Sequence, residues 1–246
     1  MDAPDPYRMP FRCWLPACVV LALALVLAGC GCDADSYYPL ARGWSWAYAV
    51  HVKTKSGART FRYVVENVGR GRLDDREVFI QRSANGASRY YREDGSGVMW
   101  VGETMPDEAA RQFPKPNTVL PAPPDRSAPP WTNEEYTTAL EGYGPPKGPL
   151  HIDISEKLEM RYVVESVDDE VEVPAGRFAH CLRIRGEGET QADIVKPVGR
   201  ITIHATSTKW FAPGVGLVKA VREETTSSST IPAGEWRMEL VEFRRP

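Results

Sequence analysis

The sequence predicts an all-β fold: a strongly curved, half-barrel-like antiparallel sheet built from two duplicated β units, with few short helices. Short segments rich in β-branched and aromatic residues recur along the chain, separated by turn signals such as Lys-Ser-Gly at 55–57. Their close spacing favours antiparallel pairing between neighbouring strands. Some segments, including 98–101, are apolar on both faces, which is typical of a curved sheet whose concave side is partly covered.

Internal repetition is the evidence for two units. The segment RYVVENV recurs as RYVVESV with a single difference, and two further matches accompany the two copies in the same order. The matched pairs are 62–68 with 161–167, 91–99 with 210–218, and the segment leading to Trp46 with the segment leading to Trp131. Three matches that occur in the same order predict two copies of one structural unit.

The predicted elements follow from the same residue types in chain order. Strands are expected in the first unit at 44–52, 59–68, 77–82, 88–92 and 98–101. In the second unit they are expected at 136–141, 158–167, 180–187, 201–210, 217–225 and 235–243. Short helices are expected at 107–113 and 132–140, although the second overlaps a predicted strand and conflicts with the repeat.

The domain organisation divides the chain into a leader, a tether and one β domain. The predicted parts are a lipoprotein signal peptide at 1–29, a lipidated tether at 30–36 and a single duplicated β domain at 37–246. The halves of that domain are expected at about 37–104 and 119–246. The proline-rich segment at about 105–131 is expected to be an extended connector that packs against the sheet.

The leader has the parts of a bacterial lipoprotein signal. Arg8 and Arg12 precede an apolar run that ends in Leu-Ala-Gly-Cys at 27–30, which resembles a lipobox. Cys30 is therefore the predicted lipidation site, and acyl chains there would anchor the protein without a membrane span. A transmembrane helix fits less well, because the run is short and contains Pro16. An ordinary signal peptide with an incidental cysteine is the other alternative.

Charge and cysteine content exclude some classes of protein. The net charge of −3 gives no electrostatic footprint for nucleic acid, so the expected partner is the membrane, through the anchor. Gly31 follows Cys30 where many inner-membrane lipoproteins have Asp, which favours the periplasmic side of the outer membrane. Cys32 and Cys181 remain after lipidation and cleavage, and whether they pair is left open.

Three motifs resemble those of a group of uncharacterised bacterial lipoproteins. They are YYPL-x-x-G-x-x-W-x-Y at 37–48, VPAGRF at 173–178 and WFAPGVGLVK at 210–219. The resemblance implies an open, strongly curved antiparallel sheet, similar to the half-barrel of periplasmic lipoprotein carriers. It provides no catalytic residue. Taken alone, the motifs are turn and hairpin signals.

A search for catalytic chemistry finds little. The four histidines lack zinc-binding spacing, and the chain has no nucleophile elbow or phosphate-binding loop. His180 is expected in the core, since it alternates with Leu182 and Ile184. The acidic stretches 74–75 and 168–170 are expected to be solvated turns. We therefore predict that the protein is not an enzyme and needs neither metal nor cofactor.

The predicted function is a non-catalytic binding or scaffolding role at the bacterial envelope. One alternative is a carrier that holds a lipid or another apolar ligand in the concavity of the sheet; an envelope protein is the other candidate partner. The candidate ligand-binding residues are Trp46, Tyr63, Tyr162, His204 and Trp210. A second alternative, a hydrolase, requires His204 to converge with an acid such as Glu165 or Asp168.

Overall fold

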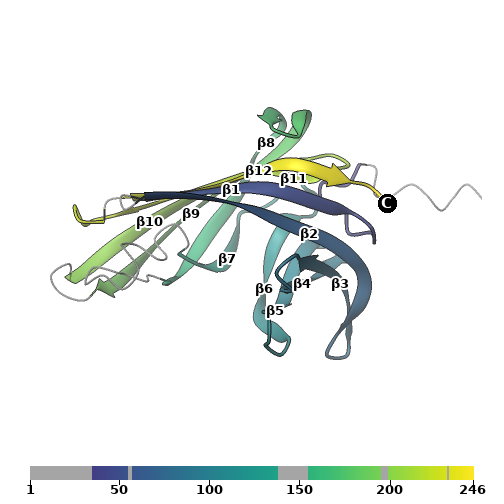
Figure 1. Cartoon of the computed structure of the whole chain (residues 1–246), viewed down its shortest axis with the longest axis horizontal. Helices are drawn as coiled ribbons and strands as arrows, with labels where there is room; N and C mark the ends of the chain where they lie inside the picture. The colour runs from purple at the N-terminus through teal and green to yellow at the C-terminus, as the bar shows by residue number, and fades with distance from the viewer. Residues whose placement is uncertain (1–34, 55–56, 138–154, 195–198, 232) are drawn as a thin grey trace, which may run out of the picture. The chain divides into compact units, whose positions relative to one another are not determined.

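Twelve β-strands form one antiparallel sheet within the unit Asp33–Pro246, which confirms the predicted fold class (Figure 1). The computed structural model describes residues 35–54, 57–137, 155–194, 199–231 and 233–246, and none of these residues is helical. Accordingly, no helix in that part of the chain is able to span a bilayer. The predicted signal peptide and Cys30 lie outside the described residues.

The strands divide into two sets of equal number. The first set is β1 (Ser45–Thr54), β2 (Gly57–Leu73), β3 (Arg76–Ser83), β4 (Ser88–Asp94), β5 (Gly97–Thr104) and β6 (Arg111–Pro121). The second set is β7 (Trp131–Tyr136), β8 (Lys157–Val173), β9 (Gly176–Ile194), β10 (Gly199–Ala212), β11 (Gly216–Thr226) and β12 (Ala233–Arg244). The strand expected at 136–141 lies mostly outside the described residues, and β6 has no predicted counterpart.

The strand order is a meander whose two sets join through the first and last strands. Successive strands are neighbours within β1–β6 and within β7–β12, and β1 pairs with β12. The repeated segment lies on β2 in one set and on β8 in the other. The second matched pair contributes to the hairpins β4–β5 and β10–β11. The matched segments therefore occupy equivalent places in the strand order.

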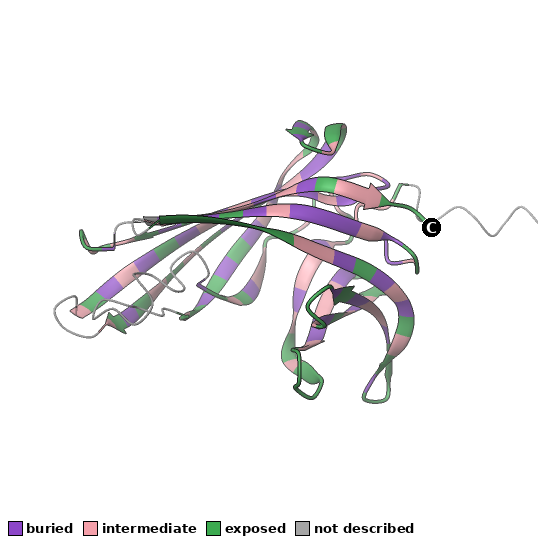
Figure 2. Ribbon diagram, viewed as in Figure 1, coloured by how far each residue is buried: buried purple, intermediate pink, exposed green. Residues whose placement is uncertain are grey.

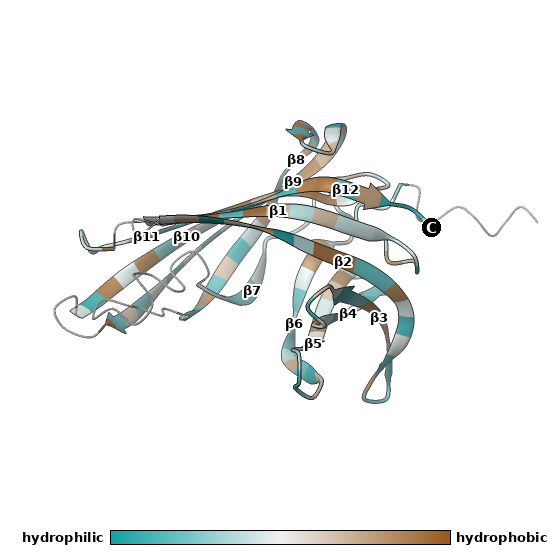
Figure 3. Cartoon of the chain, viewed as in Figure 1, coloured by the Kyte–Doolittle hydropathy of each residue, from teal (hydrophilic) through white to brown (hydrophobic). Residues whose placement is uncertain are grey.

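Alternation along each strand sets which side chains are buried. In β10, Ile201, Ile203 and Ala205 are buried, whereas His204 between them is exposed. Figures 2 and 3 show the same banding along the long strands, where buried and apolar positions alternate with exposed and polar ones. This period of two is that of a sheet with one covered face.

Strong curvature gives the sheet an inner face. Glu135 on β7 and Arg222 on β11 have three strands between them, which would put them about 19 Å apart on a flat sheet. Instead, Arg222 Nη1 lies 2.6 Å from Glu135 Oε2. The face that carries these two side chains is thus the inside of the bend, and we call it the inner face. The opposite face is called the outer face.

The chain's own N-terminal segment fills part of the inside. The Tyr38 ring lies between the rings of Tyr91 and Phe211, with centroids 5.3 and 6.3 Å away. Leu40 is buried in the same cluster, and Gly214 N–H donates to the carbonyl of Ser36. The concavity of the sheet is therefore partly a packed core.

The ends of the strand order, β6 and β7, are joined by two asparagine side chains. Asn117 accepts from Glu134 N–H at 3.1 Å and donates to its carbonyl at 3.0 Å. Asn133 accepts from Thr118 N–H at 2.9 Å and donates to its carbonyl at 2.8 Å. A side-chain amide offers the same donor and acceptor as a peptide group, so each asparagine replaces one step of a β ladder.

The two helices expected in the middle of the chain are not found among the described residues. The helix expected at 107–113 is a turn leading into β6, and the described part of the one expected at 132–140 belongs to β7. The region expected as a connector contains β6, which is an edge strand of the sheet itself. Its prolines are compatible with that place, because an edge strand has backbone positions that need not donate.

Candidate binding site

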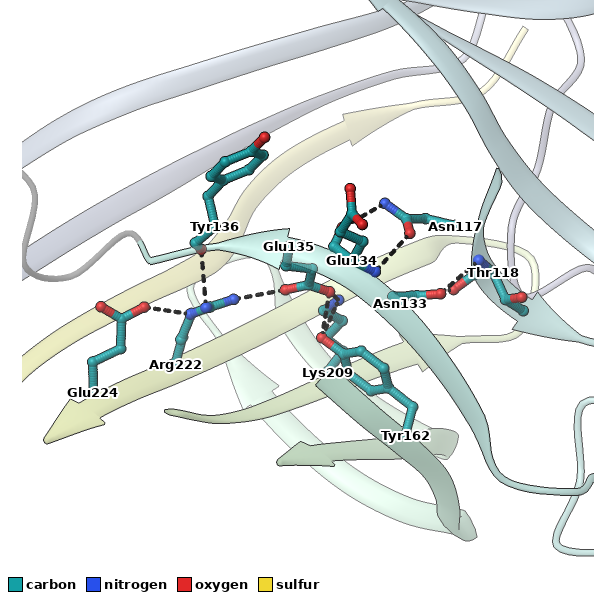
Figure 4. A network of polar contacts seen from close by, with 10 residues as sticks. All are labelled: Asn117, Thr118, Asn133, Glu134, Glu135, Tyr136, Tyr162, Lys209, Arg222 and Glu224. Atoms are coloured by element: carbon teal, nitrogen blue, oxygen red, sulfur yellow. Dashed lines mark hydrogen bonds and ion pairs between the residues drawn. The ribbon is translucent and has the colours of Figure 1, made fainter. Parts of the chain in front are cut away.

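A buried charge network occupies the inner face of the second set of strands (Figure 4). At its centre, Glu135 accepts a hydrogen bond from the Tyr162 hydroxyl at 2.6 Å. The same carboxylate pairs with Arg222 at 2.6 Å and with Lys209 at 3.7 Å. Arg222 also donates from Nε to Glu224 at 2.7 Å, and the Glu224 side chain is fully buried. Two acids and two bases thus neutralise each other inside the sheet.

The protonation states of Glu135 and Tyr162 follow from burial and from the charges beside them. Burial raises the pKa of Glu135, but the charges of Lys209 and Arg222 outweigh burial and hold that pKa below its usual value. Burial is the main cause that raises the pKa of Tyr162 above its usual value, so its hydroxyl stays protonated and donates. The network is a set of satisfied ion pairs, which fits a structural role better than proton transfer.

The inner face of the first set contains a small pocket instead of a charge network. The pocket has a volume of about 60 Å³ and lies between Tyr38, Tyr48, Tyr63 and Arg89. That volume equals roughly two water molecules, whereas pockets that enclose a drug-sized ligand hold about 300–1,000 Å³. This pocket is therefore too small for an acyl chain.

Arg89 is the charged group of this pocket. It lies on β4 and is exposed to solvent, with its guanidinium carbon 5.0 Å from the centroid of the Trp100 ring. Its cross-strand neighbour Glu103 is bound by Arg111 at 2.5 Å. Among the described residues, no carboxylate pairs with Arg89. A guanidinium without a counter-ion, beside aromatic rings, is able to bind an anion.

The aromatic walls are held in place by their polar ends. Trp46 donates from Nε1 to the carbonyl of Val215 at 2.7 Å, and the Tyr48 hydroxyl donates to that of Leu217 at 3.0 Å. Burial raises the pKa of Tyr48 above its usual value, so this hydroxyl remains a donor. The walls are consequently fixed by the N-terminal side of β11.

The structure divides the predicted ligand-binding residues between the two faces. Trp46 and Tyr63 line the inner pocket, and Tyr162 belongs to the charge network. Trp210 and His204 alternate with inner-face residues of β10 and so lie on the outer face. Trp210 donates to Asp169 at 3.1 Å, and His204 pairs with Glu189 at 3.0 Å. The sequence-based set is therefore not one site.

Two larger hollows lie on the outer face. One, of about 440 Å³, is bordered by His204 and Glu189, and the other, of about 360 Å³, lies over β1 beside Arg62 and Glu242. In both, these charged side chains pair with each other across the strands, at 3.0 Å and 3.2 Å respectively. Exposed pairs of this kind contribute little and are well screened by water.

The residues required by the hydrolase alternative do not meet. His204 contacts Glu189, Glu165 pairs with Arg183 at 3.0 Å, and Asp168 pairs with His180 at 2.6 Å. His180 is exposed and has a φ of 55°, so its expected place in the core is wrong. The register of β8 and β9 shifts around Asp169, and this irregularity breaks the alternation on which that expectation depended.

Cysteine and metal chemistry add no further site. Cys181 is a buried free thiol, and burial raises its pKa to about 11. Its suggested partner Cys32 lies outside the described residues. Within the described ranges, no cluster of histidine, cysteine and acidic side chains has the arrangement to hold a metal ion.

Sequence comparison finds no matching family model and no matching curated protein. Comparison with solved structures finds three matches, all with TM-scores below 0.5. A protein described as exported, with a YmcC-like fold, from Bacteroides fragilis has a TM-score of 0.38 and 14% identity, covering 86% of this chain and 100% of its own. One described as a lipoprotein, from Parabacteroides distasonis, has a TM-score of 0.39 and 12% identity with the same coverage. A DUF1329 family protein from Desulfovibrio piger has a TM-score of 0.26 and 9% identity, covering 82% and 85%.

Proposed function

We propose that the protein is a lipoprotein of the bacterial envelope, anchored through Cys30, whose β domain binds a ligand on its inner face without catalysis. The observation that carries the binding role is the pocket at Tyr63 and Arg89, an aromatic hollow whose cation pairs with no carboxylate among the described residues. A pocket of this size accepts a headgroup and leaves the rest of a ligand outside. Enclosure of a whole lipid, as a carrier requires, finds no support in this pocket.

The binding role is tested by native mass spectrometry. The unit Asp33–Pro246 contains the whole sheet and its core, so we expect it to fold without the leader. The expected result is a co-purifying small molecule that is lost in Tyr63→Trp, because the larger ring fills the pocket. Tyr90→Trp is the matched control, since Tyr90 is the outward neighbour of Arg89 on β4. Equal occupancy in both variants would contradict binding at this pocket.

The anchor is tested separately in the full-length protein. Cys30→Ser removes the predicted acceptor, so labelled palmitate should no longer enter the protein and the membrane fraction should lose it. Cys181→Ser is the control, because this thiol is buried in the β domain. Unchanged labelling and membrane retention in Cys30→Ser would exclude lipidation at this residue. For an anchored protein, separating inner and outer membranes then tests the proposed outer-membrane location.

A further inference from the structure

We propose that the pocket at Arg89 binds a carboxylate or phosphate group carried on an apolar or aromatic body. This inference rests on the proposed function and specifies the chemical class of its ligand. Arg89 supplies the charge, and the volume of about 60 Å³ limits what enters to a headgroup. A guanidinium donates in a planar fork that matches both carboxylate and phosphate oxygens.

The described surroundings of Arg89 give its guanidinium a neutral hydrogen-bond partner, the Tyr91 hydroxyl, and no carboxylate. Two polar side chains on the adjacent strands have other partners: Gln81 donates to Asn67 at 3.2 Å, and Glu103 pairs with Arg111. The Trp100 ring lies beside the guanidinium and orients it without neutralising it. Trp100 thus orients the Arg89 guanidinium, and no carboxylate in the described part of the sheet neutralises its charge.

The hydroxyl groups near Arg89 add no negative charge. Burial raises the pKa of Tyr91 and that of Tyr38 above their usual values, so both hydroxyls are protonated at neutral pH. A neutral phenol does not repel an anion, whereas a phenolate would. Tyr91 donates its proton to Gln81 Oε1 at 3.5 Å, so the charge that attracts an anion comes from Arg89.

The apolar body of the ligand has a place outside the pocket. Phe61 lies two residues before Tyr63 on β2, on the same face, and its side chain is 45% exposed. An exposed aromatic ring next to a charged pocket is favourable for an amphiphile, whose headgroup enters while its chain covers the ring. A free inorganic anion would use Arg89 and leave Phe61 uncovered, so the two sources of the anionic group are distinguishable.

The test is to titrate the Asp33–Pro246 unit with dodecyl phosphate, laurate, dodecanol and inorganic phosphate. Binding is measured by calorimetry and by tryptophan fluorescence. We expect both anionic amphiphiles to bind and dodecanol to bind at least tenfold more weakly. Arg89→Gln should lose at least tenfold in affinity for the anionic amphiphiles and nothing for dodecanol. Arg92→Gln is the control, because it removes the same charge from the outer face of the same strand. Phe61→Ala should weaken the binding of the amphiphiles and leave the binding of phosphate unchanged.

The outcomes separate this inference from the proposed function. Phosphate binding that depends on Arg89 and equals that of dodecyl phosphate supports the anion site but overturns the apolar body, and a free anion is then the ligand. Equal binding of dodecanol and laurate, unchanged in Arg89→Gln but lost in Tyr63→Trp, overturns the anion site and leaves the binding role intact. Absence of binding by every probe, with no co-purifying molecule in native mass spectra, overturns both. Circular dichroism confirms that each variant is folded.

Discussion

The two sets of strands place the same repeated tyrosine in different surroundings. Tyr63 and Tyr162 occupy the same position of the repeat, and each stacks on a ring of the preceding strand, Tyr48 at 6.4 Å and Trp131 at 5.8 Å. Tyr162 is 1% exposed and closed in by the charge network, whereas Tyr63 is half-buried and borders the pocket. The repeat therefore specifies the aromatic stack, and other residues decide whether the place is closed or open.

The difference originates in positions that the repeat does not share. Tyr48 lies opposite Tyr63, and Trp131 lies opposite Tyr162, so Trp131 takes the place of Tyr48 and not that of Trp46, with which the sequence match aligned it. Four residues further along, β1 has Val52 and β7 has Glu135. The carboxylate pairs with the cations that close the second set, while in the first set no carboxylate of the described residues pairs with Arg89. The charge network thus lies in one copy and the proposed binding pocket in the other.

The largest test of this contrast is Arg222→Met. The change leaves Glu224 and Glu135 buried without their shared cation, and breaking one side of a buried pair costs about 3–5 kcal/mol. We expect that loss in the free energy of unfolding, measured by urea denaturation. Arg185→Met is the matched control: its pair with Glu187 is exposed, with 45% and 65% of the side chains accessible, and such pairs contribute at most about 1 kcal/mol. Equal losses would show that the network is not the stabilising element of the second set.

A smaller effect is expected where the two sets meet at β6 and β7. Asn133→Ala removes both bonds to the peptide groups of Thr118, and each unpaired group costs about 1–3 kcal/mol when buried. Since Thr118 is partly accessible, we expect about 1–2 kcal/mol in total and faster hydrogen exchange at its amide. Thr132→Ala, one residue away, should leave that exchange unchanged. An amide that exchanges at the same rate in Asn133→Ala would mean that β7 does not protect β6.

The fold class could be predicted from the sequence because local residue patterns determine it. The period of two in 201–206, the turn signals and the repeat each report on backbone pairing between neighbouring strands. The charge network was missed because Glu135 and Arg222 meet only through the curvature of the sheet. One signal was present in β11, where Arg222 and Glu224 continue the alternation of the buried Val218 and Ala220. Charges in phase with a buried face indicate a partner on another strand.

The pocket could be predicted only in part for a related reason. Trp46 and Tyr63 were expected at a ligand site as part of the concave face of the sheet. Arg89 was missed because a lone arginine on a strand resembles any solvated cation. Its significance depends on Trp100 and on the engagement of Glu103 elsewhere, and neither relation is visible in the spacing of residues. Trp210 lies on the other face from this pocket, because it alternates with the inner-face residues of β10.

The smallest expected effect is a pH dependence of the free energy of unfolding, which arises from Glu135 in the second set of strands. The pKa of Glu135 is below its usual value of 4.5 in the folded protein, so the folded state favours the carboxylate. Its contribution is therefore complete above about pH 4.5 and is lost as the pH falls through the lowered folded value. Glu135→Gln should flatten this part of the stability curve, measured by urea denaturation between pH 3 and 7. Glu134→Gln accounts for the change in net charge, and an identical acid limb in the wild type and Glu135→Gln would show that Lys209 and Arg222 do not hold this carboxylate in its charged form.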